Sequence, residues 1–343
     1  MRLACFPGLI AAIWAQAALA FEIEEQVLYP ANQPGSELRI ISTADRAAFE
    51  PILLGFQSEN PDIAIDYTIT STTELMKALA EENAEFDLVI SSAMDLQTKL
   101  ANDGFARVYR SDATDRLPDW ARWRDQLFAF TQEPAVLILS DRAFANMAVP
   151  TTRSELIELL RETPEKFRGK IGTYDVRTSG FGYLMATQDA RVSETFWRLL
   201  EVIGRLDTQL YCCSGDMIRD IRDGKLAIAY NVLGSYAAAE LENSGGFQIV
   251  ELGDFANVML RTALISMQAE NIAEAEAMVD FLVTLENRPE LVAASGLPAI
   301  DAAALSDNAA LRPIRLGPGL LVFLDRLKRQ NFLRNWEASI TQQ

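Results

Sequence analysis

Histidine is absent from the 343-residue sequence. Its absence excludes Ser-His-Asp and Cys-His catalysis, HExxH zinc sites and any acid–base chemistry that relies on imidazole. An enzyme could still use two carboxylates held close together with the pKa of one raised, but no loop supplies an obvious pair. We therefore expect a protein that is not an enzyme, with carboxylate-dependent catalysis left open as a lesser alternative.

Complete nucleotide-binding motifs are also missing. Gly180 and Gly182 form a G-x-G, but Met185 stands where a dinucleotide-binding loop needs its third glycine. The sequence "RGKIG" around Lys170 lacks the upstream glycine and the following hydroxyl of a P-loop. We expect no cofactor and no metal site.

Cysteine is scarce, with three residues in the whole chain. Cys5 falls in the N-terminal segment, and the other two are adjacent, Cys212 and Cys213 in "LYCCSGD". They cannot form the disulfide framework of a small secreted domain. Two states are open for the pair, a vicinal disulfide or two reduced, small, buried residues at the end of a strand. We expect the second.

Apolar runs of 18 or more residues are absent after residue 20. Residues 1–20, "MRLACFPGLIAAIWAQAALA", combine Arg2, an apolar stretch and a small-x-small ending at Ala18 and Ala20. This pattern predicts a cleavable signal peptide rather than a membrane anchor, because the apolar part is short and the acidic "FEIEEQ" follows it. We expect a soluble protein of the bacterial periplasm.

Basic residues are few relative to acidic ones, 31 against 48. Cleavage after Ala20 would remove one basic residue and leave a formal charge of −18. Nucleic acid is an unsuitable partner for such a chain, because phosphate backbones bind cationic surfaces. The acidic surface is expected to serve solubility.

Short apolar runs alternate with helical patterns along the chain. Residues 38–42, 63–69 and 86–91 have the length and composition of strands, and each is followed by a small polar loop and an amphipathic segment. The same order recurs at "AVLILS" (135–140) and "KIGTY" (170–174). The pattern predicts an α/β fold with mostly parallel sheets flanked by helices, and about 320 residues predict two lobes.

Polar loops follow most of the predicted strands, and parallel sheets bring such loops together at one edge. Ser, Thr, Gly, Asn and Asp also cap helices, so a single loop of this kind is no evidence for a site. Their repetition predicts a shared polar site, and Tyr174, Phe181 and Tyr236 are the aromatic residues best placed to line it. The candidate ligand-binding residues are Thr43, Ala44, Asp45, Thr72, Ser92, Ala93, Met94, Glu133, Arg177, Thr178, Ser179, Gly180, Phe181, Ser214, Asn231 and Tyr236.

The loop "RTSGFG" is the best single candidate for an anion site. Free N–H groups at a helix start attract anions, and glycine lets a ligand approach closely. Arg177 adds a forked cationic donor beside that helix start. The alternative is a surface arginine before an ordinary cap.

Several segments resemble the periplasmic solute-binding proteins of ABC importers, in the ferric-type extracellular group. These are "FEPILLGFQSENPDIAIDY", "FDLVISSAMDLQTKLANDGFA", "TYDVRTSGFGYLMATQDAR", "DGKLAIAYNVLGSYA", "AEAMVDFLVTLENRPELVAASG" and "RLGPGLLVFLDRLKRQNFLRNW". "SSAMDLQ", "TSGFGYLMATQDAR" and "AYNVLGSYA" resemble a subgroup found with phosphoglycerate-type or tricarboxylate-type two-component regulators.

The resemblance implies a type II two-lobed clamp with a cleft between the lobes and a hinge at 130–139 and 253–266. It also implies a monomer that delivers its solute to an inner-membrane ABC permease, or alternatively one that presents it to a sensor kinase. The expected organisation is a signal peptide (1–20), a loosely packed leader (21–36), the first part of lobe 1 (37–132), lobe 2 (133–252) and a return to lobe 1 with C-terminal helices (253–343).

The resemblance also bears on the solute. Ferric members hold iron with two adjacent tyrosines after the strand matched by "LAIAY", where this chain has Asn231, so iron is a lesser alternative. Relatives bind an anion at the helix start matched by Ser179 and Gly180, so the preferred solute is a small organic phosphate or carboxylate.

Two roles are open for Glu133. It could be an acid in the cleft, which favours an amine or hydroxyl-rich ligand, or a hinge acid paired with an arginine. Asp45 and Asp95 look first like N-caps, and a zwitterion becomes plausible if several acids face the cleft.

Overall fold

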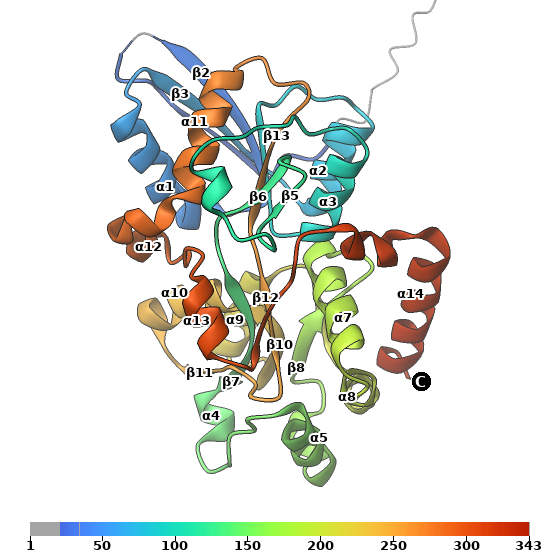
Figure 1. The fold of residues 1–343 in the computed structure, drawn as a ribbon. Helices are drawn as coiled ribbons and strands as arrows, with labels where there is room; N and C mark the ends of the chain where they lie inside the picture. Colours follow the sequence, from blue (N-terminus) through green and yellow to red (C-terminus); the bar gives the residue numbers. More distant parts are fainter. Residues whose placement is uncertain (1–20, 34, 343) are drawn as a thin grey trace, which may run out of the picture.

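The computed structural model describes residues 21–33 and 35–342, and the expected signal peptide lies outside them. Two seven-stranded sheets, each flanked by helices, form two lobes that lie one above the other in Figure 1. Among the residues that the structure describes, no helix is both long and apolar enough to span a membrane.

The lobe 1 sheet has the strand order β1-β3-β2-β4-β13-β6-β5. In that order the strands are Glu25–Tyr29, Ile63–Ile69, Ser36–Ser42, Leu88–Ser91, Thr262–Ile265, Leu127–Ala129 and Arg122–Trp123. The helices of this lobe are α1 (Arg46–Glu59), α2 (Thr72–Ala80), α3 (Met94–Asn102), η1 (Thr114–Arg116), α11 (Ile272–Val283), η2 (Leu285–Asn287) and α12 (Pro289–Ser295).

The lobe 2 sheet has the order β14-β12-β7-β10-β8-β9, and β11 pairs with β7. These strands are Leu311–Pro313, Ala256–Met259, Glu133–Ser140, Ile228–Leu233, Ile171–Tyr174, Gln209–Tyr211 and, for β11, Phe247–Val250. The remaining helices are α4 (Asp141–Phe144), α5 (Arg153–Glu162), α6 (Pro164–Phe167), α7 (Gly180–Val192), α8 (Thr195–Gly204), α9 (Ser214–Arg222), α10 (Gly234–Ser244), α13 (Ala302–Asp307), η3 (Pro318–Leu324) and α14 (Arg326–Ile340).

Both sheets are mixed. The strands that precede polar loops pair in parallel, β2 with β3 and β4, and β8 with β9 and β10. The crossover strands β7 and β13 pair antiparallel to their neighbours because they run from one lobe into the other. The expectation of mostly parallel sheets therefore holds for the strands that carry the site and not for the crossovers.

Two chain crossings coincide with the expected hinge segments. Residues 130–132 join β6 of lobe 1 to β7 of lobe 2, and residues 260–261 join β12 to β13. A third segment lies beside the first, because the Gln132 N–H donates to the Pro298 carbonyl at 3.0 Å and the Asp301 N–H donates to Gln132 Oε1 at 2.7 Å.

The leader is not loosely packed as expected. Its residues 25–29 form β1, an edge strand antiparallel to β3 with Tyr29 opposite Ile65. Tyr29 is buried and donates a hydrogen bond to Glu50 Oε1 at 3.0 Å. Val27 and Tyr29, two residues apart, both pack against the lobe 1 core, which is the spacing of a strand with one buried face.

The C-terminal segment also differs from its expected return to lobe 1. Strand β14 pairs with β12 in the lobe 2 sheet, and α14 packs on lobe 2 beside α7 and α8. Apolar packing accounts for this position, because Phe332, Trp336 and Ile340 of α14 are buried in the lobe 2 core. The ring of Phe332 contacts those of Tyr183 and Trp197.

Candidate functional site

A pocket of about 150 Å³ lies between the two lobes, where the loops after the parallel strands converge. Its lining residues are Glu24, Thr43, Asp45, Thr70, Ser71, Thr72, Ser92, Tyr174, Thr178, Ser179, Gly180, Phe181, Cys212, Cys213, Ser214, Gly215, Leu233 and Tyr236. Ten of the sixteen candidate residues are among them, as are all three aromatic residues expected to line the site. The rule that loops at the carboxyl ends of parallel strands build one site accounts for this convergence.

Lobe 1 contributes three hydroxyl-bearing loops. Thr43 follows β2, residues 70–72 follow β3, and Ser92 follows β4. Ser71 caps α2 by accepting a hydrogen bond from the Glu74 N–H at 3.3 Å. The first N–H groups of α2 therefore lie at the pocket without intrahelical partners.

Lobe 2 contributes the starts of α7, α9 and α10. Ser179 caps α7 by accepting a hydrogen bond from the Gly182 N–H at 3.1 Å. A Cβ added to Gly180 would lie 2.9 Å from Cγ2 of Thr72 across the pocket, so glycine is required where the lobes approach each other. Ser214, at the start of α9, shares a hydrogen bond with Tyr174 and accepts another from the Leu233 N–H at 3.2 Å.

One hydrogen bond joins the lobes at the pocket itself. The N–H of Asp45 in lobe 1 donates to the hydroxyl of Tyr236 in lobe 2 at 3.4 Å. Burial raises the pKa of Tyr236, so the ring is neutral at physiological pH. The lobes are thus in contact around the pocket, and their apolar residues form one continuous cluster that includes Met94 from lobe 1 and Phe181 from lobe 2.

Among residues 21–33 and 35–342, the charged side chains that line this pocket are both acidic, Glu24 and Asp45. The pKa of Glu24 is raised, first by burial and then by the negative charges of Asp45 and Glu22. Helix N-termini and hydroxyl donors are therefore the groups of this lining that can attract an anion.

Arg177 lies outside the pocket, contrary to expectation. Its Nε and Nη2 donate to the two carboxylate oxygens of Asp175 at 2.8 and 2.6 Å, and its guanidinium lies 5.8 Å from the Trp336 ring centroid. The pairing lowers the pKa of Asp175. Asp175, two residues away, and the docked helix α14 hold this cation outside the pocket.

Glu133 is also outside the pocket and is the hinge acid of the two alternatives. It is fully buried and accepts hydrogen bonds from Arg261 Nε at 3.1 Å and Nη2 at 3.2 Å, from Thr131 Oγ1 at 2.9 Å, and from the Ser235 hydroxyl. Because Glu133 and Arg261 lie on the two crossover segments, their ion pair joins those segments.

Four further candidates are buried away from the pocket. Asn231 donates to Asp189 at 2.8 Å, within a network that also contains Tyr230 and Arg153. The other three, all fully buried packing residues, are Ala44, Ala93 and Met94.

Asp45 and Asp95, the two acids expected as N-caps, occupy different positions in their helices. Asp45 occupies the N-cap position of α1, but its side chain makes no capping hydrogen bond and faces the pocket instead. Asp95 lies inside the first turn of α3, and burial raises its pKa to about 7.

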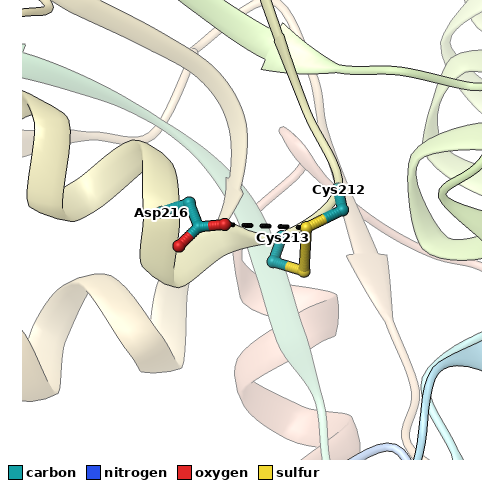
Figure 2. A group of neighbouring side chains, drawn as sticks. All are labelled: Cys212, Cys213 and Asp216. Carbon is teal, nitrogen blue, oxygen red and sulfur yellow. Dashed lines mark hydrogen bonds between the residues drawn. A yellow bond between two sulfur atoms is a disulfide. The ribbon is translucent and has the colours of Figure 1, made fainter. Parts of the chain in front are cut away.

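Cys212 and Cys213 form a vicinal disulfide, whereas we expected reduced, buried thiols (Figure 2). Both residues are exposed and line the pocket, and Cys213 is the N-cap residue of α9. The Asp216 carboxylate lies 3.6 Å from Cys212 Sγ, and the three side chains form a potential metal-ligand group. As a disulfide, however, the pair has no thiolate to offer a metal.

Sequence reasoning missed several lining residues for identifiable reasons. Thr70 and Ser71 belong to the same loop as the predicted Thr72, so taking the whole loop would have found them. Glu24 reaches the pocket because the leader pairs with β3, and the Glu24 N–H donates to the Ile69 carbonyl at 2.9 Å. That pairing is non-local, so the leader sequence alone does not show which strand it joins.

Two α/β lobes joined by crossover strands, with a polar pocket between them, define a two-lobed periplasmic binding protein. Residues 38–295 match the family model of bacterial extracellular solute-binding proteins, and the chain belongs to this family. No curated protein sequence shows a significant match to the chain.

Solved structures agree with this assignment. The substrate-binding protein of an ABC transporter from Agrobacterium tumefaciens is 30% identical, with a TM-score of 0.87 over 92% of this chain and 98% of its own. AfuA from Actinobacillus pleuropneumoniae, with fructose-6-phosphate bound, is 15% identical (TM-score 0.72; 90% and 99% covered). Iron-bound HitA from Pseudomonas aeruginosa is 16% identical (TM-score 0.68; 89% and 99% covered). The last two show a shared fold, and the expected resemblance to the ABC-importer group is confirmed.

Proposed function

We propose that this protein captures a small organic anion, bearing a phosphate or carboxylate, between its lobes and delivers it to an ABC importer from the periplasm after cleavage of its signal peptide. The observation that carries the proposal is the convergence of helix starts α2, α7 and α9 on one pocket. Free N–H groups and aligned peptide dipoles at these starts favour a negatively charged group without a basic side chain.

The acidic pair limits what the rest of the solute can be. Glu24 and Asp45 would repel a second anionic group, but they are suitable partners for hydroxyl or ammonium donors. A pocket of 150 Å³ is comparable with a cavity that holds a molecule about the size of benzene, which is smaller than a hexose phosphate. We therefore favour a short solute with one anionic end and one hydroxyl or ammonium end.

The other functional alternatives have less support from the site. Tyr230, the last residue of the "LAIAY" strand after which ferric members place their iron-binding tyrosines, accepts a hydrogen bond from Arg153 at 2.7 Å and donates one to Asp189 at 2.6 Å, away from the pocket. Presentation of the loaded protein to a sensor kinase needs the same closed lobes, and no feature of the pocket favours it over delivery to a permease. We propose a monomer that performs no catalysis.

Mass spectrometry of small molecules released from gently purified protein tests the proposal, followed by calorimetric titration of the identified compound. Ser179→Ala removes a hydroxyl at the α7 start, and we expect about fivefold to tenfold weaker binding. Arg177→Gln is the matched control outside the pocket and should leave affinity within about twofold, because its guanidinium already pairs with Asp175. A neutral solute, or equal affinities for Ser179→Ala and wild type, would contradict the proposal.

A further inference from the structure

Basic residues gather near the C-terminus of this acidic chain. Residues 311–336 contain six arginines or lysines and a single acid, Asp325, whereas the whole chain has 31 basic residues against 48 acidic ones. The local reversal of charge places positive potential on one part of the surface.

A surface groove of about 470 Å³ lies where this segment passes the end of α7. Arg191 from α7 and Arg312 and Arg315 from the C-terminal segment line it, and we name it the arginine groove. The other lining residues are uncharged: Gln188, Val192, Asn257, Pro313, Ile314, Leu316, Gly317, Pro318, Gly319 and Leu320.

Within the described part of the chain, the three guanidiniums form no ion pair. Over residues 21–33 and 35–342, none of them lies within 4.0 Å of a carboxylate oxygen, whereas Arg153, Arg177 and Arg261 all form ion pairs. Arg191 Nη1 has one long contact of 3.4 Å, to Gln188 Oε1. Three like charges around one groove repel one another, and an anion placed between them would remove that repulsion.

We propose that the arginine groove is a second ligand site, separate from the solute pocket, for a small polyanion such as a tricarboxylate or phosphate. A guanidinium presents forked donors that match two oxygens of a carboxylate or phosphate, so two or three arginines select ligands with several anionic oxygens. The groove is about three times the volume of the solute pocket, which suits a larger and more highly charged ligand.

The groove also touches both lobes. Within its wall, the Ile314 N–H donates to the Val258 carbonyl of lobe 2 at 2.9 Å, and the Leu316 N–H donates to the Trp120 carbonyl of lobe 1 at 2.9 Å. A polyanion bound there would stabilise the arrangement of lobes in which both contacts exist. Because linkage is reciprocal, it would then tighten solute binding, and solute would tighten polyanion binding.

Calorimetric titration with citrate and, separately, inorganic phosphate tests this site. We expect saturable binding with a dissociation constant below about 1 mM for at least one of them, weakening as ionic strength rises. The double variant Arg312→Gln/Arg315→Gln should bind at least about tenfold more weakly. Arg326→Gln is the control, because it removes an exposed arginine of the same segment that does not line the groove.

Two outcomes would overturn the proposal. One is absence of saturable binding by both probes, and the other is equal weakening by Arg326→Gln and by the groove variants, which indicates nonspecific attraction. Ser179→Ala distinguishes the two sites, since it should weaken solute binding and leave citrate or phosphate binding unchanged. Failure at the groove would therefore leave the proposed solute site untouched.

Discussion

The buried ion pair between Glu133 and Arg261 gives the sharpest quantitative prediction. Glu133 is fully buried, and Arg261 is 1% exposed. Within the described part of the chain, Nη1 of Arg261 already lacks a hydrogen-bond partner, so Glu133 is the group that neutralises this cation. Glu133→Gln would leave a buried, uncompensated guanidinium at the junction of the two crossover segments.

Removing one member of a buried pair typically costs about 3–5 kcal/mol in the free energy of unfolding. At roughly 2 °C per kcal/mol for a protein of this size, the melting temperature of Glu133→Gln should fall by about 6–10 °C. Circular dichroism during thermal unfolding measures this shift. The matched control is Asp175→Asn, which breaks the half-exposed pair with Arg177 and should cost less than about 1 kcal/mol because water screens it.

A second variant separates lost charge compensation from lost packing. Glu133→Leu combined with Arg261→Met replaces both charges by apolar groups, and such replacements are often neutral or stabilising. We expect this double variant to recover most of the stability lost in Glu133→Gln. In the cycle of Glu133→Leu, Arg261→Met and the double variant, the coupling energy between the two positions should be favourable. A fall of less than about 1 kcal/mol for Glu133→Gln would refute the reasoning.

Three further predictions concern single features of the site. Asp95 has a pKa raised to about 7, so wild type should lose stability relative to Asp95→Asn as pH rises from about 4 to 7, which urea unfolding at several pH values measures. Reduction of Cys212–Cys213 by a phosphine should change solute affinity by calorimetry but hardly move the melting temperature, because a bridge between neighbours closes no loop. Tyr236→Phe removes the hydrogen bond between the lobes, so small-angle scattering should show a less compact liganded particle and titration should show several-fold weaker binding.

The sequence predicted the parts of the site that depend on local rules. Strands such as β2, β3 and β4 are apolar runs with their own turn signals, and residues like Ser71 and Ser179 cap the helices that follow. Parallel pairing then brings their loops to one edge without further information. Ten of the residues that these rules singled out line the pocket, and their contact with solute is part of the proposed function.

The predictions that the structure does not match are of two kinds. Some depend on residues that are distant in the chain, and others depend on which of several nearby groups a side chain contacts. Glu133 and Arg261 are separated by 128 residues, and only the fold shows that they meet. The docking of α14 on lobe 2 depends on apolar residues whose partners lie in α7 and α8. Arg177 was assigned to the pocket from its position alone, and the competing acid at Asp175 decided its direction.

The acidic residues of the pocket predict that solute affinity depends on pH. The direction of that dependence differs between a purely anionic solute and one that also carries an ammonium group. The pKa of Glu24 is raised, so this carboxyl gains its proton before an ordinary surface glutamate as pH falls. Protonation removes repulsion toward a purely anionic solute, whose affinity should then rise with acidity. It also removes an attraction for ammonium, so a zwitterion should bind more weakly under the same conditions.

Titration of the released solute at several pH values between 4 and 7.5, in wild type and in Glu24→Gln, measures both trends. Glu24→Gln should abolish the dependence, and an unchanged pH profile in that variant would show that Glu24 does not act on the solute.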